Sequence, residues 1–141
     1  MNIKKSWEYS TAPESVDHII LNDKYDLFIN GEFVPSKSGN YFDTINPATE
    51  NRIAKVSDAN NRDVDIAVLS ARDSYEKIWS KMEAKERGKY IYRIARLLQE
   101  RAREFSIIES MDGGKPIRES RDVDIPLAVA HFFIMQAGLI N

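Results

Sequence analysis

Hydrophobic and polar positions alternate over residues 26–57 and then change to a longer period. Two apolar runs flank Asn30-Gly31, a dipeptide that favours a tight hairpin because both residues tolerate positive φ. Strands are predicted, in chain order, at about residues 26–29, 32–34, 41–45 and 52–57. The first third of the chain is therefore expected to be a small β meander.

From residue 60 the apolar positions repeat with the 3.6-residue period of an α-helix. Asn60 can cap the first helix, and Asp63 lies in its first turn, where unpaired N–H groups favour a carboxylate. The predicted inward stripe of this helix consists of Val64, Ala67, Val68, Ala71 and Tyr75. A second helix is predicted over about residues 84–111. Its predicted inward residues are Ile91, Ile94, Ala95, Leu98, Ala102 and Phe105, and Gly113-Gly114 stops it.

The end of the sequence is strongly apolar. After Pro116 a short helical segment is expected to about residue 121, and Asp124 and Pro126 then open a last helix. Residues 127–138 of this helix are apolar on nearly all sides, which is typical of a helix inside a larger protein. Four short strands followed only by helices also lack obvious sheet partners. We therefore expect an incomplete part of a larger fold.

Composition narrows the range of functions. The chain has 141 residues, 43% hydrophobic and 30% charged, which is typical of a globular protein. Its net charge of -2 disfavours nucleic acid and anionic membranes as partners. The apolar run at about 125–135 is shorter than the roughly 20 residues needed to cross a bilayer, so no membrane span is expected. Residues 1–23 are predicted to be a tail. Residues 1–17 are polar and lack the apolar centre of a secretory signal, so we expect a cytoplasmic location, which the lack of cysteine also fits.

Few residues offer chemistry. His18 and His131 have no second ligand at metal-binding spacing, and His131 is expected to be a core or interface residue. A chain without cysteine has no thiolate nucleophile. The segment 113–115 lacks the pattern of a phosphate-binding loop, because Glu109 and Pro116 stand where that loop needs glycine and a hydroxyl. No Gly-x-Gly-x-x-Gly turn is present. We therefore expect neither catalytic nor cofactor-binding residues.

Six segments carry a resemblance to a known family. They are residues 27–34 (LFINGEFV), 45–50 (INPATE), 63–72 (DVDIAVLSAR), 86–89 (ERGK), 93–98 (RIARLL) and 112–116 (DGGKP). In order and spacing, over about residues 27–132, they resemble the aldehyde dehydrogenase superfamily.

The resemblance implies an α/β fold. Residues 24–141 would form the N-terminal segment of the cofactor-binding domain, a β meander with three to four helices, without the Rossmann-type sheet. The family oxidises aldehydes to carboxylic acids with NAD or NADP. It uses a cysteine that forms a thiohemiacetal, donors that stabilise the oxyanion, and a glutamate that activates water. The resemblance places all of these beyond residue 141, so no cofactor is expected for this chain alone.

The resemblance also implies two sites. Many members bind Na or K through two main-chain carbonyls and an aspartate, which match Thr44, Ile45 and Asp112. Oxygen ligands suit such hard cations. The alternative is that Asp112 faces solvent or caps a turn. Ile125 and Pro126 match the region that lines the substrate tunnel.

Two departures from the family pattern are present. Gly113 stands where relatives often have asparagine, and residues 136–140 (QAGLI) replace the more usual Tyr-Ala-Gly-Trp-Ala. The second departure indicates a natural stop or a frameshift at the terminus.

Two hypotheses follow from the sequence. The first is the N-terminal fragment of an aldehyde dehydrogenase, inactive by itself and completed by the remainder of the enzyme. The second is a non-catalytic module in which residues 127–138 associate with a second copy or with a full-length relative.

Overall fold

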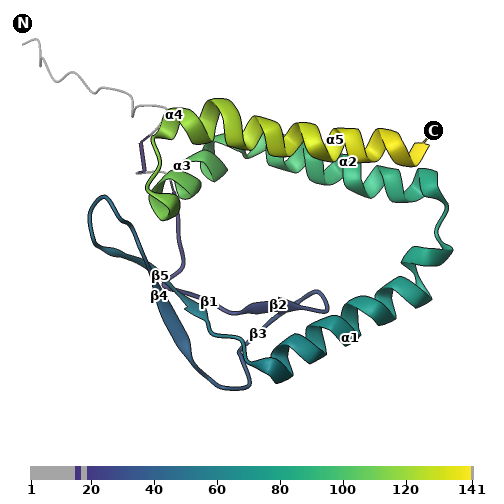
Figure 1. Cartoon of the computed structure of the whole chain (residues 1–141), viewed down its shortest axis with the longest axis horizontal. Helices are drawn as coiled ribbons and strands as arrows, with labels where there is room; N and C mark the ends of the chain where they lie inside the picture. The colour runs from purple at the N-terminus through teal and green to yellow at the C-terminus, as the bar shows by residue number, and fades with distance from the viewer. Residues whose placement is uncertain (1–14, 17–18, 141) are drawn as a thin grey trace, which may run out of the picture.

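The computed structural model describes residues 15–16 and 19–140, so most of the tail predicted over residues 1–23, His18 included, lies outside the described part. The strands are β1 (Lys24–Tyr25), β2 (Leu27–Ile29), β3 (Glu32–Val34), β4 (Tyr41–Ile45) and β5 (Arg52–Ser57). The helical elements are α1 (Asn61–Lys77), η1 (Trp79–Lys81), α2 (Ala84–Glu100), α3 (Ala102–Gly113), α4 (Ile117–Glu119), η2 (Ser120–Asp124) and α5 (Ile125–Ile140). Figure 1 shows the strands and α1 along one side of an open arrangement, and the antiparallel α2 and α5 along the other. The expected mixed α/β architecture is confirmed.

The predicted strands all form, but they divide between two sheets. β2 and β3 make the hairpin about Asn30-Gly31, and both of these residues have positive φ as expected (56° and 83°). β4 pairs antiparallel with β5, and β1 adds to the other edge of β5 in parallel. Local sequence patterns do not predict β1, because its two residues pair with a strand about 30 positions away.

The start of α1 is fixed by the predicted cap. The side chain of Asn60 accepts hydrogen bonds from the backbone N–H groups of Arg62 (2.9 Å) and Asp63 (3.3 Å). The Asp63 carboxylate in turn accepts from the backbone N–H of Asn60 at 2.9 Å, which completes a capping box. The predicted inward stripe is wrong for this chain, because Val64 and Val68 are about half exposed.

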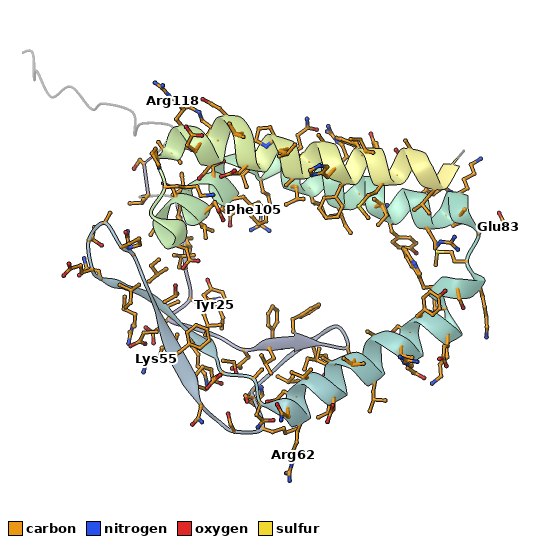
Figure 2. All side chains as sticks on the ribbon, in the orientation of Figure 1. Tyr25, Lys55, Arg62, Glu83, Phe105 and Arg118 are labelled. Atoms are coloured by element: carbon orange, nitrogen blue, oxygen red, sulfur yellow. The ribbon has the colours of Figure 1, made fainter. Side chains whose placement is uncertain are left out.

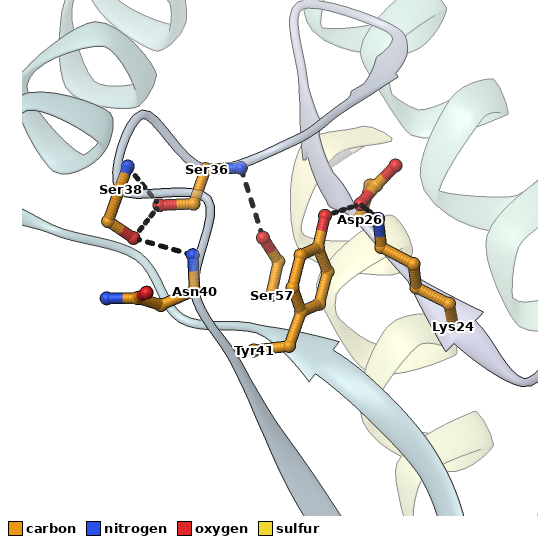
Figure 3. A network of polar contacts seen from close by, with 7 residues as sticks. All are labelled: Lys24, Asp26, Ser36, Ser38, Asn40, Tyr41 and Ser57. Carbon is orange, nitrogen blue, oxygen red and sulfur yellow. Dashed lines mark hydrogen bonds and ion pairs between the residues drawn. The ribbon is translucent and has the colours of Figure 1, made fainter.

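Asp63 also ties α1 to the loop before β4. It is 3% exposed, and it accepts hydrogen bonds from the Ser36 hydroxyl (2.6 Å) and the backbone N–H of Lys37 (2.9 Å). The backbone N–H of Ser36 donates to the Ser57 hydroxyl at 3.1 Å, as Figure 3 shows. The Ser36 hydrogen bond, followed by the Asn60 N–H, lowers the pKa of Asp63 below its ordinary value of 3.8. This buried network fixes α1 relative to the loop before β4 and to the end of β5.

Replacing Asp63 with asparagine should make the protein less stable and its stability less dependent on pH. Because the folded pKa lies below 3.8, the carboxylate stabilises the fold fully above that pH, and the stabilisation is lost as the pH falls through the folded pKa. At neutral pH we expect D63N to lower the thermal midpoint by roughly 5 °C or more. Circular dichroism melts between about pH 5 and pH 2 would measure both effects. D65N, at an exposed position of the same helix, is the control, and an unchanged pH slope in D63N would contradict the assignment.

The second predicted helix is two helices. The backbone leaves helical geometry at Arg101 (φ -101°, ψ 17°), so α2 ends at Glu100 and α3 begins at Ala102. The Arg101 guanidinium donates two hydrogen bonds to the Glu104 carboxylate (2.9 and 2.7 Å), which holds the first turn of α3. The break turns α3 away from α2 toward the strands (Figure 1). Gly114 ends α3 in the left-handed conformation, as predicted.

The two last predicted helices are one continuous helical run. α4, a π-helical turn (η2) and α5 follow one another without an intervening loop. Pro126 has no N–H, and its ring would clash with the carbonyl four residues earlier in a regular α-helix, so the wider turn just before it accommodates the proline. Ser120 is the first residue of this turn and is fully buried. Its hydroxyl has no hydrogen-bond partner among the described residues.

The helical core lies between α2 and α5. Ala95 of α2 is fully buried, Val129 of α5 is 7% exposed, and the rings of Tyr92 and Phe133 lie 5.6 Å apart between their centroids. Leu98 and Phe105 are partly buried as predicted, whereas Ile94 and His131 are exposed. The hydrophobic side chains that are buried in the described part of the chain are Ala54, Ala95, Ile107 and Val129.

Many apolar side chains larger than these buried ones are exposed, on both sides of the open arrangement. On the outer face of α5, Leu127, Ile134 and Met135 are each more than half exposed. On the β2–β3 hairpin, the rings of Phe28 and Phe33 contact each other at a tilt of 55°, with 5.1 Å between their centroids, yet both remain exposed. A folded chain that leaves so much apolar surface in water presents surfaces suited to a further partner.

The run Ile117–Leu139 is 23 residues long and apolar enough to cross a membrane by length and composition. The sequence predicts no such helix, because the apolar run at 125–135 is too short by itself and the segment before it is predicted as a separate short helix. Core helices of soluble proteins can have the same length and composition but are mostly buried. Here only 6% of the apolar window is buried, and α5 packs along α2 by one face.

Candidate functional site

A crevice lies between the three-stranded sheet and α3. Its volume is about 510 Å³. In Figure 2, Tyr25 projects from β1 toward the helices on the other side. The lining residues are Leu21, Tyr25, Phe42, Thr44, Ile53, Ala54, Val56, Ile108, Glu109 and Asp112. Apolar side chains thus form most of the wall, and two carboxylates from α3 lie at its helix side.

Thr44 and Asp112 meet in this crevice although they are 68 positions apart in the sequence. The Thr44 hydroxyl donates a hydrogen bond to Oδ1 of Asp112, which joins β4 to the last turn of α3. Ile45 is the next residue of β4, at the point where the pairing with β5 shifts register. The structure therefore joins Thr44 to Asp112, and Ile45 follows Thr44 in the chain; that these three residues bind an Na or K ion stays a prediction.

The donor set is compatible with a hard cation. Oxygen atoms are the ligands that alkali cations prefer, and a carboxylate oxygen keeps acceptor capacity after one hydrogen bond. Among the described residues no group of three or more His, Cys, Asp or Glu side chains could hold a metal ion, so main-chain carbonyls of β4 would have to complete this site. Asp112 is exposed, as one part of the alternative expected, but its hydrogen bond runs to Thr44 on β4 and does not cap a turn.

The turn after β4 packs directly on the end of α3. Asn46 accepts a hydrogen bond from the backbone N–H of Ala48 at 2.9 Å, which forms the predicted turn. Gly114 has a φ of 68°, and a Cβ atom there would lie 2.4 Å from Cγ of Pro47. Only glycine allows this close approach of the turn to the helix end.

Replacing Gly114 with alanine should destabilise the protein more than the same change at Gly39. Gly39 also has a positive φ (71°), but a Cβ atom there would meet nothing within 4 Å. Both variants carry the cost of a left-handed alanine, about 1–2 kcal/mol, and only G114A adds the clash with Pro47. Urea denaturation would measure the difference, which we expect to exceed about 1 kcal/mol. Equal losses would show that the Pro47 contact does not fix the helix end.

Lys115 links the crevice side of α3 to the π-helical turn. Its ammonium group lies 2.8 Å from the Asp124 carboxylate and 3.0 Å from that of Glu109. The Asp124 hydrogen bond, followed by that of Glu109, raises the pKa of Lys115 above its ordinary value of 10.5. The Ser110 hydroxyl donates to the carbonyl of Lys115 at 2.7 Å, which holds the backbone in place. Sequence reasoning considered Lys115 only for a phosphate loop, because its true partners lie six and nine residues away on different elements.

Residues 33–140 match the sequence profile described as the Aldehyde dehydrogenase family. The chain belongs to the aldehyde dehydrogenase family. An aldehyde dehydrogenase of Alternaria alternata is 41% identical over 102 residues, which are 72% of this chain and 20% of that protein. Aldehyde dehydrogenase 2 (NAD(P)+) of Saccharomyces cerevisiae is 37% identical over 107 residues, which are 76% of this chain and 21% of that protein.

Solved aldehyde dehydrogenases share the fold of this chain. The NAD+ complex of the aldehyde dehydrogenase from Bacillus cereus superposes with a TM-score of 0.80 and 39% sequence identity. The match covers 83% of this chain and 24% of that one. The chain therefore spans about a fifth to a quarter of the length of the aldehyde dehydrogenases that it matches.

Ile125 and Pro126, which the resemblance assigns to the substrate tunnel, lie outside this crevice, and that assignment stays a prediction. Ile125 and Pro126 are the first residues of α5, and neither is among the residues that line the crevice. Ile125 is partly buried and Pro126 is exposed. The structure brings together the ion-site residues, but it keeps the tunnel residues apart from them.

Proposed function

We propose that this chain is the N-terminal part of an NAD- or NADP-dependent aldehyde dehydrogenase and that these 141 residues alone do not oxidise aldehydes. The observation that carries the proposal is that the chain matches only about a fifth of the length of its relatives. Its large apolar side chains also remain exposed. In the whole enzyme, the remainder of the polypeptide would cover these faces.

The chemistry of the family favours a structural role for this segment and not a catalytic one. Aldehyde oxidation in the family needs a thiol to form the thiohemiacetal, and these 141 residues contain no cysteine. NAD or NADP would accept the hydride on the remainder of the enzyme. We propose that this chain supplies helices that pack against the cofactor-binding sheet, with Ile125 and Pro126 bordering the substrate tunnel.

The proposal also includes a bound Na or K ion and a cytoplasmic location for the enzyme. The carbonyls of Thr44 and Ile45, with the Asp112 carboxylate, would hold a structural Na or K ion that keeps β4 and α3 together. A cytoplasmic enzyme accords with the absence of cysteine from these residues. We propose a protein interface rather than a bilayer for α5, because the helical run also contains Asp122 and Asp124 near its start.

Activity of the purified chain tests the proposal. We expect no NADH absorbance at 340 nm above a protein-free blank when the chain is mixed with propanal and NAD+, because no thiol nucleophile is present. The Bacillus cereus aldehyde dehydrogenase, assayed in parallel, controls for the reagents. Turnover of propanal by the purified chain would overturn the proposal.

A second candidate function is self-association without catalysis. The observation that favours it is the exposed outer face of α5, which carries Leu127, Ile134 and Met135 within residues 127–138. Light scattering over a range of concentrations distinguishes the candidates. A discrete small oligomer at low concentration would favour the self-associating module, whereas a monomer would favour an N-terminal part that awaits its remainder.

A further inference from the structure

We infer that His131 lies at the centre of the surface that binds the remainder of the enzyme and makes this binding depend on pH. The histidine is neutral in the complex, so acid weakens the complex. This inference rests on the proposed function, in which the remainder of the polypeptide covers α5. It adds a pH-sensitive group to that surface, which consists of Leu127, His131, Ile134 and Met135.

The geometry of α5 places His131 opposite the packed face of the helix. Each residue turns an α-helix by about 100°, so His131 lies about 200° around the axis from the buried Val129. Leu127, Ile134 and Met135 lie within about 60° of it on the same side, and each is more than half exposed. His131 is itself exposed. It is therefore the polar centre of an apolar stripe and not a core residue.

No carboxylate of the described chain balances a charge on His131. The sequence of α5 contains no Asp, Glu, Lys or Arg, so His131 is the group of this helix that titrates between pH 5 and 8. α5 contacts α2, α3 and η2. The ion pairs of these elements join Lys89 to Glu86, Arg96 to Glu100, Arg101 to Glu104, Lys115 to Glu109 and Asp124, and Arg121 to Asp122. Within the described residues, His131 belongs to none of these pairs.

The remainder of the enzyme is the partner that covers this surface. The segment that the chain matches is 20% of the Alternaria alternata enzyme, so about four fifths of that protein lies outside the match. Covering the stripe removes His131 from water together with its apolar neighbours. An imidazolium ion that loses its hydration without gaining a counter-charge is destabilised, so the neutral imidazole is the bound form. Binding then releases the proton held by the free chain, and the affinity falls as the pH falls.

Titration calorimetry at two pH values tests the inference. The full chain is titrated at pH 7.5 and pH 5.5 into the Bacillus cereus enzyme that lacks the matching segment. We expect the affinity to be about 10-fold lower at pH 5.5, because an ordinary histidine titrates near pH 6.5. At pH 6.5, binding should release about half a proton, which is measured as a difference in heat between two buffers of different ionisation enthalpy.

Two variants separate this histidine from other titrating groups. H131L removes the charge and keeps the surface apolar, so its affinity should change by less than about 2-fold between the two pH values. H18L changes the other histidine of the chain and should keep the full loss at pH 5.5. The Bacillus cereus part is the same in every titration, so its own titrating groups contribute equally.

The outcomes distinguish this inference from the proposed function. An equal loss of affinity in H131L would overturn the inference, and so would tighter binding of the natural chain at pH 5.5, the result expected if a carboxylate paired with His131. No binding of the natural chain at pH 7.5 would overturn the proposed function as well. Dilution of the chain alone tests for a second copy on this surface: a heat of dissociation that disappears at pH 5.5 would overturn the assignment to the remainder.

Discussion

Replacing Val129 with aspartate should abolish the packing of α5 on α2. Val129 is 7% exposed, and it lies four residues before Phe133, whose ring contacts Tyr92 of α2, so both side chains share one face of α5. A carboxylate there would lose its hydration without gaining a partner, at a cost of about 4 kcal/mol or more. That cost is comparable to the lower limit of the about 5–15 kcal/mol by which small domains are stable. We expect loss of the cooperative thermal transition in circular dichroism.

Ile134 provides the matched control for this change. It is on the same helix and is 67% exposed, so aspartate there keeps its hydration. We expect I134D to unfold within about 2 °C of the natural chain, because exposed substitutions rarely change stability by more than about 0.5 kcal/mol. Two variants with equal midpoints would contradict the placement of the α2–α5 interface.

Mixing this chain with the remainder of a relative should produce an aldehyde dehydrogenase. The test uses the Bacillus cereus enzyme lacking the segment that this chain matches. Under the proposal, the remainder carries the thiol and the cofactor site, and this chain supplies the helices that hold them in place. We expect NADH formation from propanal to rise by about 100-fold or more over either part alone.

I134D shows whether the exposed face of α5 is responsible. Because the variant keeps its own fold, a loss of activity in the mixture must come from contact with the remainder. We expect its activity in the mixture to fall by about 10-fold or more, as a buried charge at an interface would require. Full activity with I134D would place the contact elsewhere on the chain.

Local sequence patterns predicted those elements that local interactions determine. Asn60 and Asp63 cap α1 as expected, and Asn30-Gly31 forms the hairpin, because each involves hydrogen bonds or φ preferences within a few residues. The position of Gly114 at the end of α3 follows in the same way.

Long-range pairings could not be predicted from those patterns. The parallel addition of β1 to β5 and the approach of Pro47 to Gly114 both depend on segments that meet only in the folded chain. Periodicity also identifies an apolar face without saying what covers it. Val64 and Val68 show this, since the predicted inward face of α1 is exposed in this chain.

The candidate site, too, could be predicted from the sequence only in part. Composition excluded a thiol nucleophile directly. The resemblance named Thr44 and Asp112 as ion ligands; their side chains are hydrogen-bonded to each other, and ion binding stays a prediction. The crevice itself could not be predicted, because its wall combines four elements that are remote in sequence. The Lys115 bridge was missed for the same reason.

The central claim is that the exposed apolar faces pack against the rest of an aldehyde dehydrogenase. Isothermal titration calorimetry at several temperatures tests it most directly. This chain is titrated into the Bacillus cereus enzyme that lacks the matching segment. Burial of roughly 1,500 Å² of mostly apolar surface predicts a heat-capacity change of about -0.3 to -0.6 kcal/mol per kelvin, and a smaller one for I134D. An absence of binding, or a heat-capacity change near zero, would contradict the claim.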